Sequence, residues 1–132
     1  MAVADSITEP AIAELVRRFY GKARLDPTIG PLFNEAVQDW DEHFAKLADF
    51  WSSVMLTTGR YHGNPMAAHL KHRIEPEFFA RWLRLWHDTT GEVFGPEIAA
   101  QFGVKAERIA ESLRLALFYR PGAFPIRRAA TR

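Results

Sequence analysis

The chain contains no cysteine. Disulfide bonds, thiolate metal sites and cysteine nucleophiles are therefore excluded. An excess of charge of either sign is also lacking, because 17 Lys and Arg residues stand against 16 Asp and Glu residues. Without a strong positive charge, the composition gives no electrostatic reason to expect nucleic acid or an anionic membrane surface as a partner.

Long apolar runs are missing as well. No stretch approaches the roughly 20 apolar residues that a membrane-spanning helix requires. The segment from Met1 to Glu9 holds two acidic residues, no basic residue and no apolar run, so we do not expect a signal peptide. These absences favour a protein of the reducing cytoplasm, and a chain of 132 residues fits one domain.

Aromatic side chains are abundant instead, with ten Phe, four Trp and three Tyr. Large flat side chains in such number suit a large flat ligand, although they also suit an ordinary core. Apolar residues recur at helical spacing almost throughout, and no segment alternates convincingly at period two. The pattern predicts an all-α domain over residues 1–120, followed by a basic, disordered tail at 121–132.

About six helices are expected, and several have clear start and stop signals. Asp39 with Glu42 three residues on forms a capping box, and the helix that it opens is expected to run to Thr58 and stop at Gly59. Gly103-Val104 is expected to bend or break the last helix. The other helices are expected to start near Thr8-Glu9-Pro10, just before Leu32, at Asn64-Pro65, around Glu75-Pro76 and after Gly95-Pro96, the last one reaching Tyr119.

Histidines are the first candidates for chemistry: His43, His62, His69, His72 and His87. Most enzyme patterns are absent, since the chain has no Glu-x-x-His pair, no His-Glu-x-x-His, no Gly-x-Ser-x-Gly and no glycine-rich phosphate loop. The spacing His62-x6-His69-x2-His72 leaves open a three-histidine metal site, although it matches no standard pattern.

One helical face combines a histidine with an apolar stripe. Positions 43, 47, 50, 51 and 54 share that face, and they hold His43, Leu47, Phe50, Trp51 and Val54. A histidine at the head of such a stripe is expected to be buried, and its polar edge then needs a partner.

Tyr20 and Trp82 have the same requirement for their hydroxyl and indole N–H groups. Taken singly, each of these residues is most simply interpreted as a core residue whose polar atom meets a carbonyl group or water. Together with His69, they indicate two helices that present histidines toward one apolar slot. This is how a helical protein holds haem.

Several motifs, in this order along residues 8 to 118, resemble the truncated haemoglobins, and their third group most closely. The motifs are Phe19-Tyr20, Gly30-Pro31-Leu32-Phe33, Trp40-x2-His43-x6-Phe50-Trp51, Tyr61-x-Gly63-x-Pro65-x3-His69-Leu70 and Phe79-x2-Trp82-Leu83. The resemblance implies a two-over-two helical sandwich around haem b.

The resemblance also implies roles for individual residues. His69 would be the proximal iron ligand, and Tyr20, His43 and Trp82 would be the distal residues. The apolar walls of the haem pocket would be Phe33, Leu47, Phe50, Trp51 and Phe79. His72 is not expected from the family and is the alternative ligand, but only His69 completes the Gly-x-Pro-x3-His spacing. His62 and His87 have no role there and are expected at the surface.

The function implied is reversible binding of O₂ and other small diatomic ligands. Oxygen transport needs ready release of the ligand, whereas three possible donors would hold a polarised ligand tightly. The pocket therefore favours O₂ activation, NO detoxification or peroxide chemistry, of a dioxygenase or peroxidase type, with a reductase as a possible partner. The alternative from another class is a cofactor-free helical interaction module whose aromatic residues form only a core.

Overall fold

The structure, a computed structural model, describes residues 3–65, 69 and 74–118, and these residues form helices and no strand. The helices are α1 (Glu9–Ala23), α2 (Gly30–Ala36), α3 (Trp40–Leu56), α5 (Pro76–Val93) and α6 (Pro96–Phe118). Between α3 and α5, Pro65 and His69 are also helical, as expected for the short helix opened at Asn64-Pro65. The all-α prediction is confirmed.

Helix starts follow the local signals in the sequence. The Thr8 hydroxyl accepts a hydrogen bond from the N–H of Ala11 (3.2 Å) at the start of α1. The Asp39 carboxylate accepts one from the N–H of Glu42 (3.1 Å) at the start of α3, which confirms the predicted N-cap. Each of these contacts satisfies a backbone donor that has no partner within the helix.

The expected stop of α3 and the expected break in α6 are both wrong. α3 ends at Leu56, because Thr57 adopts the left-handed conformation (φ 54°) before Gly59 is reached. α6 continues through Gly103 without interruption. Gly103 instead makes room for a neighbour, since a Cβ there would lie 2.8 Å from Cε1 of His87 on α5.

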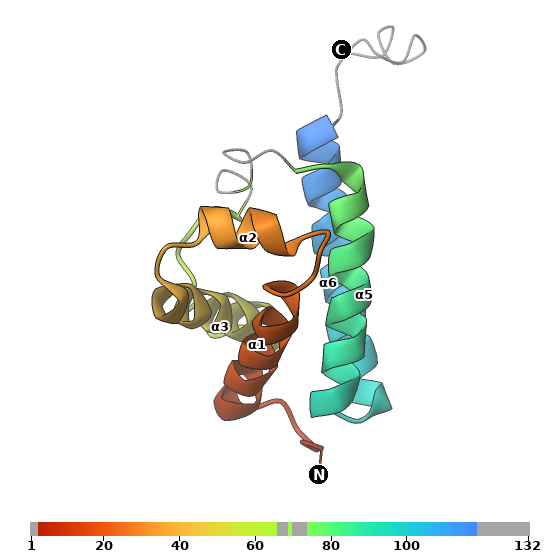
Figure 1. Ribbon diagram of the computed structural model, residues 1–132. Helices are drawn as coiled ribbons and strands as arrows, with labels where there is room; N and C mark the ends of the chain where they lie inside the picture. The colour runs from red at the N-terminus through yellow and green to blue at the C-terminus, as the bar shows by residue number, and fades with distance from the viewer. Residues whose placement is uncertain (1–2, 66–68, 70–73, 119–132) are drawn as a thin grey trace, which may run out of the picture.

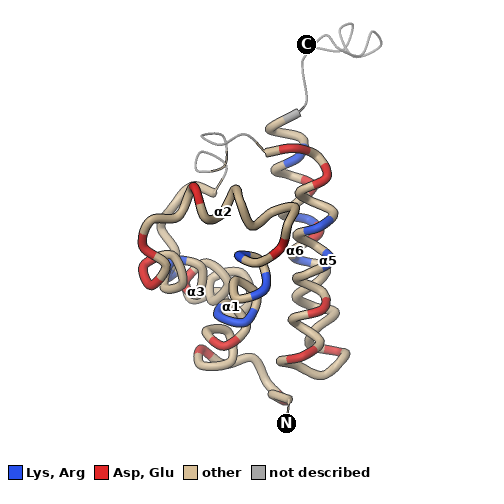
Figure 2. The backbone as a smooth tube through the Cα atoms, in the orientation of Figure 1, with Lys and Arg blue, Asp and Glu red and all other residues tan. Residues whose placement is uncertain are grey.

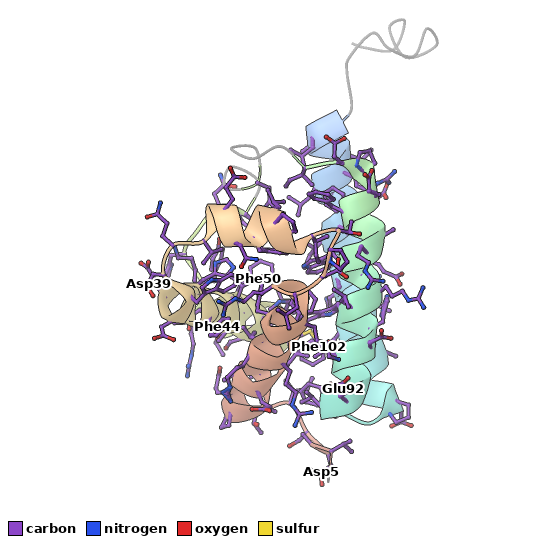
Figure 3. The ribbon with its side chains drawn as sticks, in the orientation of Figure 1. Asp5, Asp39, Phe44, Phe50, Glu92 and Phe102 are labelled. Carbon is purple, nitrogen blue, oxygen red and sulfur yellow. The ribbon has the colours of Figure 1, made fainter. Side chains whose placement is uncertain are left out.

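Two helix pairs form the two layers of the fold. α5 packs along α6, α3 packs on α1, and α1 joins the pairs by packing on α5. Figure 1 shows α5 and α6 side by side and antiparallel, with α2 crossing near the end where α5 begins. Figure 3 shows Phe102 on the side of this arrangement toward α5, in the core between the layers.

The core is built from large aromatic rings. Trp86 contacts Phe19 from α1 (5.2 Å between ring centroids) and Trp51 from α3 (4.5 Å). Phe102 from α6 stacks on Phe94, with ring centroids 4.9 Å apart. All five side chains are at most 2% exposed. Edge-to-face and offset-stacked contacts of this kind add stability beyond burial alone.

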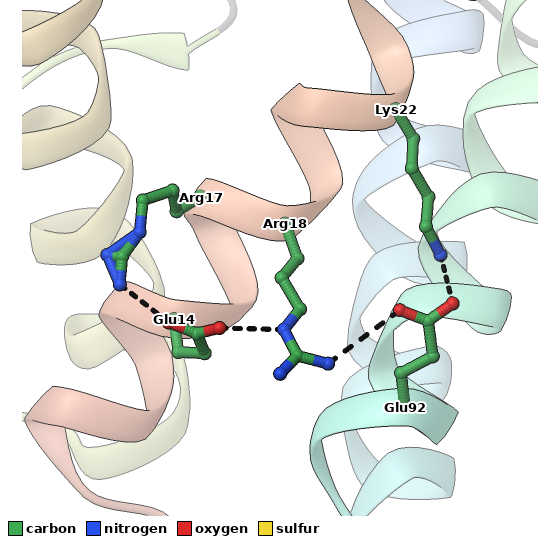
Figure 4. Close-up of polar contacts among 5 residues, drawn as sticks. All are labelled: Glu14, Arg17, Arg18, Lys22 and Glu92. Carbon is green, nitrogen blue, oxygen red and sulfur yellow. Dashed lines mark hydrogen bonds and ion pairs between the residues drawn. The ribbon is translucent and has the colours of Figure 1, made fainter. Parts of the chain in front are cut away.

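Polar contacts fasten α1 to the end of α5 (Figure 4). Arg18 binds Glu14 (2.7 Å) and reaches Glu92 of α5, and Lys22 also binds Glu92. The backbone N–H of Ala4 donates to the Val93 carbonyl (2.8 Å) at the same end. Figure 2 shows both charge signs along α5 and α6. No helix within the described ranges is long and apolar enough to cross a membrane.

Candidate cofactor site

A cavity of about 540 Å³ lies beside the core, a volume typical of sites for small molecules and cofactors. Residues from all five helices and from the segment between α3 and α5 line it. Every site residue expected from the sequence lines this one cavity: Tyr20, Phe33, His43, Leu47, Phe50, Trp51, His69, Phe79 and Trp82. The structure therefore brings together side chains up to 62 positions apart (82 − 20).

The His69 ring is oriented by the backbone four residues earlier in the chain. Its Nδ1 lies 2.6 Å from the carbonyl oxygen of Pro65. A carbonyl can only accept, so Nδ1 carries a proton, and in a neutral ring Nε2 then keeps its lone pair. A histidine ligand of a metal commonly has this arrangement, with one ring nitrogen bound to a carbonyl and the other left for the metal.

His43 places a second imidazole at the same cavity. Its Nε2 is buried and has no hydrogen-bond partner among the described residues. Burial, and to a smaller extent the charges of Lys46 and His69, lower the pKa of His43, so its ring is neutral near pH 7. Buried polar atoms are rarely left without a partner, which indicates that a ligand or water meets this nitrogen.

Tyr20 and Trp82 bring hydroxyl and indole groups to the cavity from α1 and α5. The Tyr20 ring meets the edge of the His43 ring, with centroids 5.1 Å apart. Burial raises the pKa of the Tyr20 hydroxyl well above its ordinary value, so this group stays protonated and can donate. The structure therefore places three possible donors around one space, with His69 lining the same space.

The walls are mostly apolar, and the sequence identified only part of them. Figure 3 shows Phe50 near α2, on the side of the molecule where the cavity lies. Further apolar walls that the sequence did not assign to the site are Ile29, Leu32, Ala36, Val37, Pro65, Ile74, Phe78, Ile109, Ala110 and Leu113. Ile109 and Leu113 lie on the apolar stripe of the last helix, which was the available signal for them.

Polar and charged residues that the sequence did not assign to the site also line the cavity. Lys46 supplies the one ammonium or guanidinium group among the described lining residues. Tyr61 joins the lining, and its ring meets Phe50 edge to face (5.2 Å). Gln38, Asp39 and Glu42 complete the polar part. Among these residues, Lys46 is the one whose charge could pair with an anionic substituent on a flat apolar ligand.

The remaining histidines are placed differently. His62 is exposed, and His87 is exposed and lies 3.1 Å from a Glu107 carboxylate oxygen, as expected for surface positions. His72, the alternative ligand and third member of the three-histidine site, lies outside the described residues. Within those residues, no group of three or more His, Asp or Glu side chains could hold a metal ion. A haem iron needs only one such ligand from the protein, so the donor set fits haem.

Comparisons with known proteins place the chain among its relatives. No family model matches the chain. The chain is 34% identical over 119 residues to the group 3 truncated haemoglobin ctb of Campylobacter jejuni, covering 86% of this chain and 94% of that protein. It also aligns with the crystal structure of group III truncated haemoglobin from Campylobacter jejuni, with a TM-score of 0.84 and 34% identity, over 93% of this chain and all of that one.

Proposed function

Because this chain belongs to the group 3 truncated haemoglobins, we propose that its cavity binds haem b, with His69 as the iron ligand and Tyr20, His43 and Trp82 facing the bound small ligand. The two-over-two fold and the binding of haem and small ligands belong to the family. The cofactor-free interaction module is therefore set aside.

The observation that carries the residue assignment is the state of the two imidazoles. The Pro65 carbonyl fixes the His69 tautomer that leaves Nε2 available, while His43 Nε2 is buried without a partner among the described residues. Both rings line the same apolar cavity. Haem, when bound, would supply an iron that can bind an imidazole and a diatomic ligand.

The Lys46 ammonium would suit the carboxylate groups of the cofactor. Haem b carries two propionate groups, and an ammonium at the cavity wall would pair with one of them. Phe33, Leu47, Phe50 and Phe79 would contact the apolar macrocycle and exclude water from it.

The donors support turnover of a bound ligand rather than simple oxygen transport. Tyr20, His43 and Trp82 would hold a polarised O₂, NO or peroxide and slow its release. A protein that activates its ligand in this way needs a source of electrons, so a reductase partner is part of the proposal. A cytoplasmic setting is also part of the proposal.

Optical spectra of the reconstituted protein test the assignment. Haem-supplemented wild type is expected to give a Soret band in stoichiometric amount, and His69→Ala is expected to lose the haem or hold it weakly. His62→Ala, which changes an exposed histidine seven positions earlier, is the matched control and should bind haem normally. His72→Ala should leave the ferric and ferrous spectra intact. Loss of haem in His72→Ala with retention in His69→Ala would contradict the assignment.

A further inference from the structure

Three of the four tryptophans form one continuous stack. Trp86 lies 4.5 Å from Trp51, at an interplanar angle of 21°, and 5.6 Å from Trp82, at 3°. Trp51 and Trp82 both line the cavity, while Trp86 is buried behind them. The stack therefore runs from one cavity wall, through the core, to another cavity wall.

The chemistry of indole gives this arrangement a use that ligand binding does not require. Indole is among the side chains that lose an electron most readily, and stacked indoles share the resulting positive charge, which lowers its energy. Phe19 and Phe102 contact the stack and are much harder to oxidise. The positive charge left when the stack loses an electron would therefore stay on the indole rings.

Resting on the proposed haem function, we propose that the Trp51–Trp86–Trp82 stack supplies one electron to the cavity when peroxide reacts there. Reduction of one hydrogen peroxide to two waters consumes two electrons and two protons. The stack supplies one of these electrons, the second would come from the bound haem, and both protons come from solvent. The stack is left as an indole radical cation, and two equivalents of an external one-electron donor such as ascorbate return both electrons, one to the stack and one to the haem group.

The surroundings of Trp86 keep this oxidation reversible. An indole radical cation becomes a long-lived neutral radical by losing its Nε1 proton to an acceptor. The Trp86 Nε1 is buried and has no hydrogen-bond partner among the described residues. Tyr20 is the poorer electron source, because its oxidation requires loss of the hydroxyl proton and burial raises the pKa of that group.

Freeze-quench electron paramagnetic resonance tests the proposal. Haem-loaded protein with a stoichiometric Soret band is mixed with one equivalent of hydrogen peroxide, in samples grown with ring-deuterated Trp or ring-deuterated Tyr. The expected radical narrows with deuterated Trp and not with deuterated Tyr, and Trp86→Phe loses most of it. Trp40→Phe is the matched control, because Trp40 contacts the cavity-lining Tyr20 (5.6 Å) but lies outside the stack. It should keep the signal.

A second readout needs no variant. Wild-type protein treated repeatedly with peroxide is expected to gain oxygen at Trp51, Trp82 or Trp86 rather than at Trp40 in peptide mass maps. A radical that responds only to deuterated Tyr, a signal undiminished in folded Trp86→Phe, or oxidation confined to Trp40 would each overturn the proposal. Absence of the Soret band before peroxide is added would instead refute haem binding, so the two failures are distinguishable.

Discussion

Three possible hydrogen-bond donors reach the cavity from three different helices, and under the proposed assignment these single residues would decide how long a ligand stays. Tyr20 offers an O–H and Trp82 an N–H, and His43 has a buried Nε2 whose proton depends on its tautomer. A hydrogen bond to a polarised partner contributes about 1.5–3 kcal/mol. Under that assignment the donors would slow release of the ligand by stabilising the bound state.

We expect Tyr20→Phe or Trp82→Phe to speed O₂ dissociation by at least about tenfold, since about 1.4 kcal/mol corresponds to a factor of ten. Stopped-flow measurement of O₂ release from the ferrous protein checks this. Tyr61→Phe is the control, because Tyr61 lines the cavity while its hydroxyl lies against the Gly63 position. Unchanged rates in both test variants would mean that these polar groups serve the fold, and the case against oxygen transport would fail.

The residues that line the site were predictable to the extent that each carries its own chemical signal. His43 and His69 stood out by type and spacing, and both line the cavity. Lys46 did not, because a lysine on a helix is an ordinary surface feature until the chain folds around it. Tyr61 appeared only within a family motif, with no role assigned to its side chain. Ala110 could not be assigned to the site from the sequence, because a small apolar residue on a helix is typical of any packed face.

At the scale of elements, the turn between α1 and α2 is held by one buried carboxylate. Asp26 accepts hydrogen bonds from the N–H groups of Thr28 (2.9 Å) and Ile29 (3.1 Å), and Arg81 of α5 binds its other oxygen (2.6 Å). Burial raises the pKa of Asp26, but the bonds from Ile29, Arg81 and Thr28 outweigh it and leave the pKa below its ordinary value. The turn that leads into α2 is thus tied to α5.

This lowered pKa predicts a pH dependence of stability. A carboxylate whose pKa is lower in the folded state stabilises the fold above its unfolded pKa, near 3.8, and loses that contribution as the pH falls through the folded value. We expect Asp26→Asn to cost about 1–3 kcal/mol at pH 7 and to unfold less steeply with acid below about pH 4. Urea titrations at several pH values measure both effects.

Asp88→Asn is the control for that series, since Asp88 is an exposed aspartate on the same helix as Arg81. Its stability should follow the wild-type pH profile. Parallel pH profiles for Asp26→Asn and wild type would show that the carboxylate charge contributes nothing to folding.

Helix starts were predictable and helix interruptions were not, for a physical reason. An N-cap such as Asp39 acts within three residues, so its signal is complete in the local sequence. The behaviour of α6 at Gly103 depends on His87 from another helix, which the local sequence does not contain. The end of α3 likewise depends on Ser52, whose hydroxyl binds Glu9 of α1 and Thr58 beyond the helix (2.7 Å each).

At the scale of the whole molecule, the cofactor completes the core. The cavity opens beside the largest buried rings, and Trp51 belongs to both. Without haem, its apolar walls have no partner on one side and lose those contacts.

We therefore expect haem to raise the midpoint of thermal unfolding in a concentration-dependent way. At about 100 times the dissociation constant, binding adds roughly 2.7 kcal/mol, which corresponds to about 10 °C for a domain of this size. Circular dichroism melts of apo and haem-loaded protein measure the shift. Equal midpoints would show that the cavity walls are no part of the cooperative core, and His69→Ala with added haem should melt close to the apo-protein.

The contacts between α1 and the end of α5 also set an order of events during synthesis. Lys22 can form its ion pair only after Glu92, 70 positions later, has been added to the chain. The hydrogen bond of Ala4 likewise requires Val93. At roughly 5–20 residues per second, Lys22 is added to the chain about 4–14 s before Glu92. α1 and α3 can meet first, but the face they present to Trp86 stays open to water until α5 arrives. The nascent chain is therefore most prone to aggregate or to recruit chaperones within this interval, well before haem has a complete site to enter.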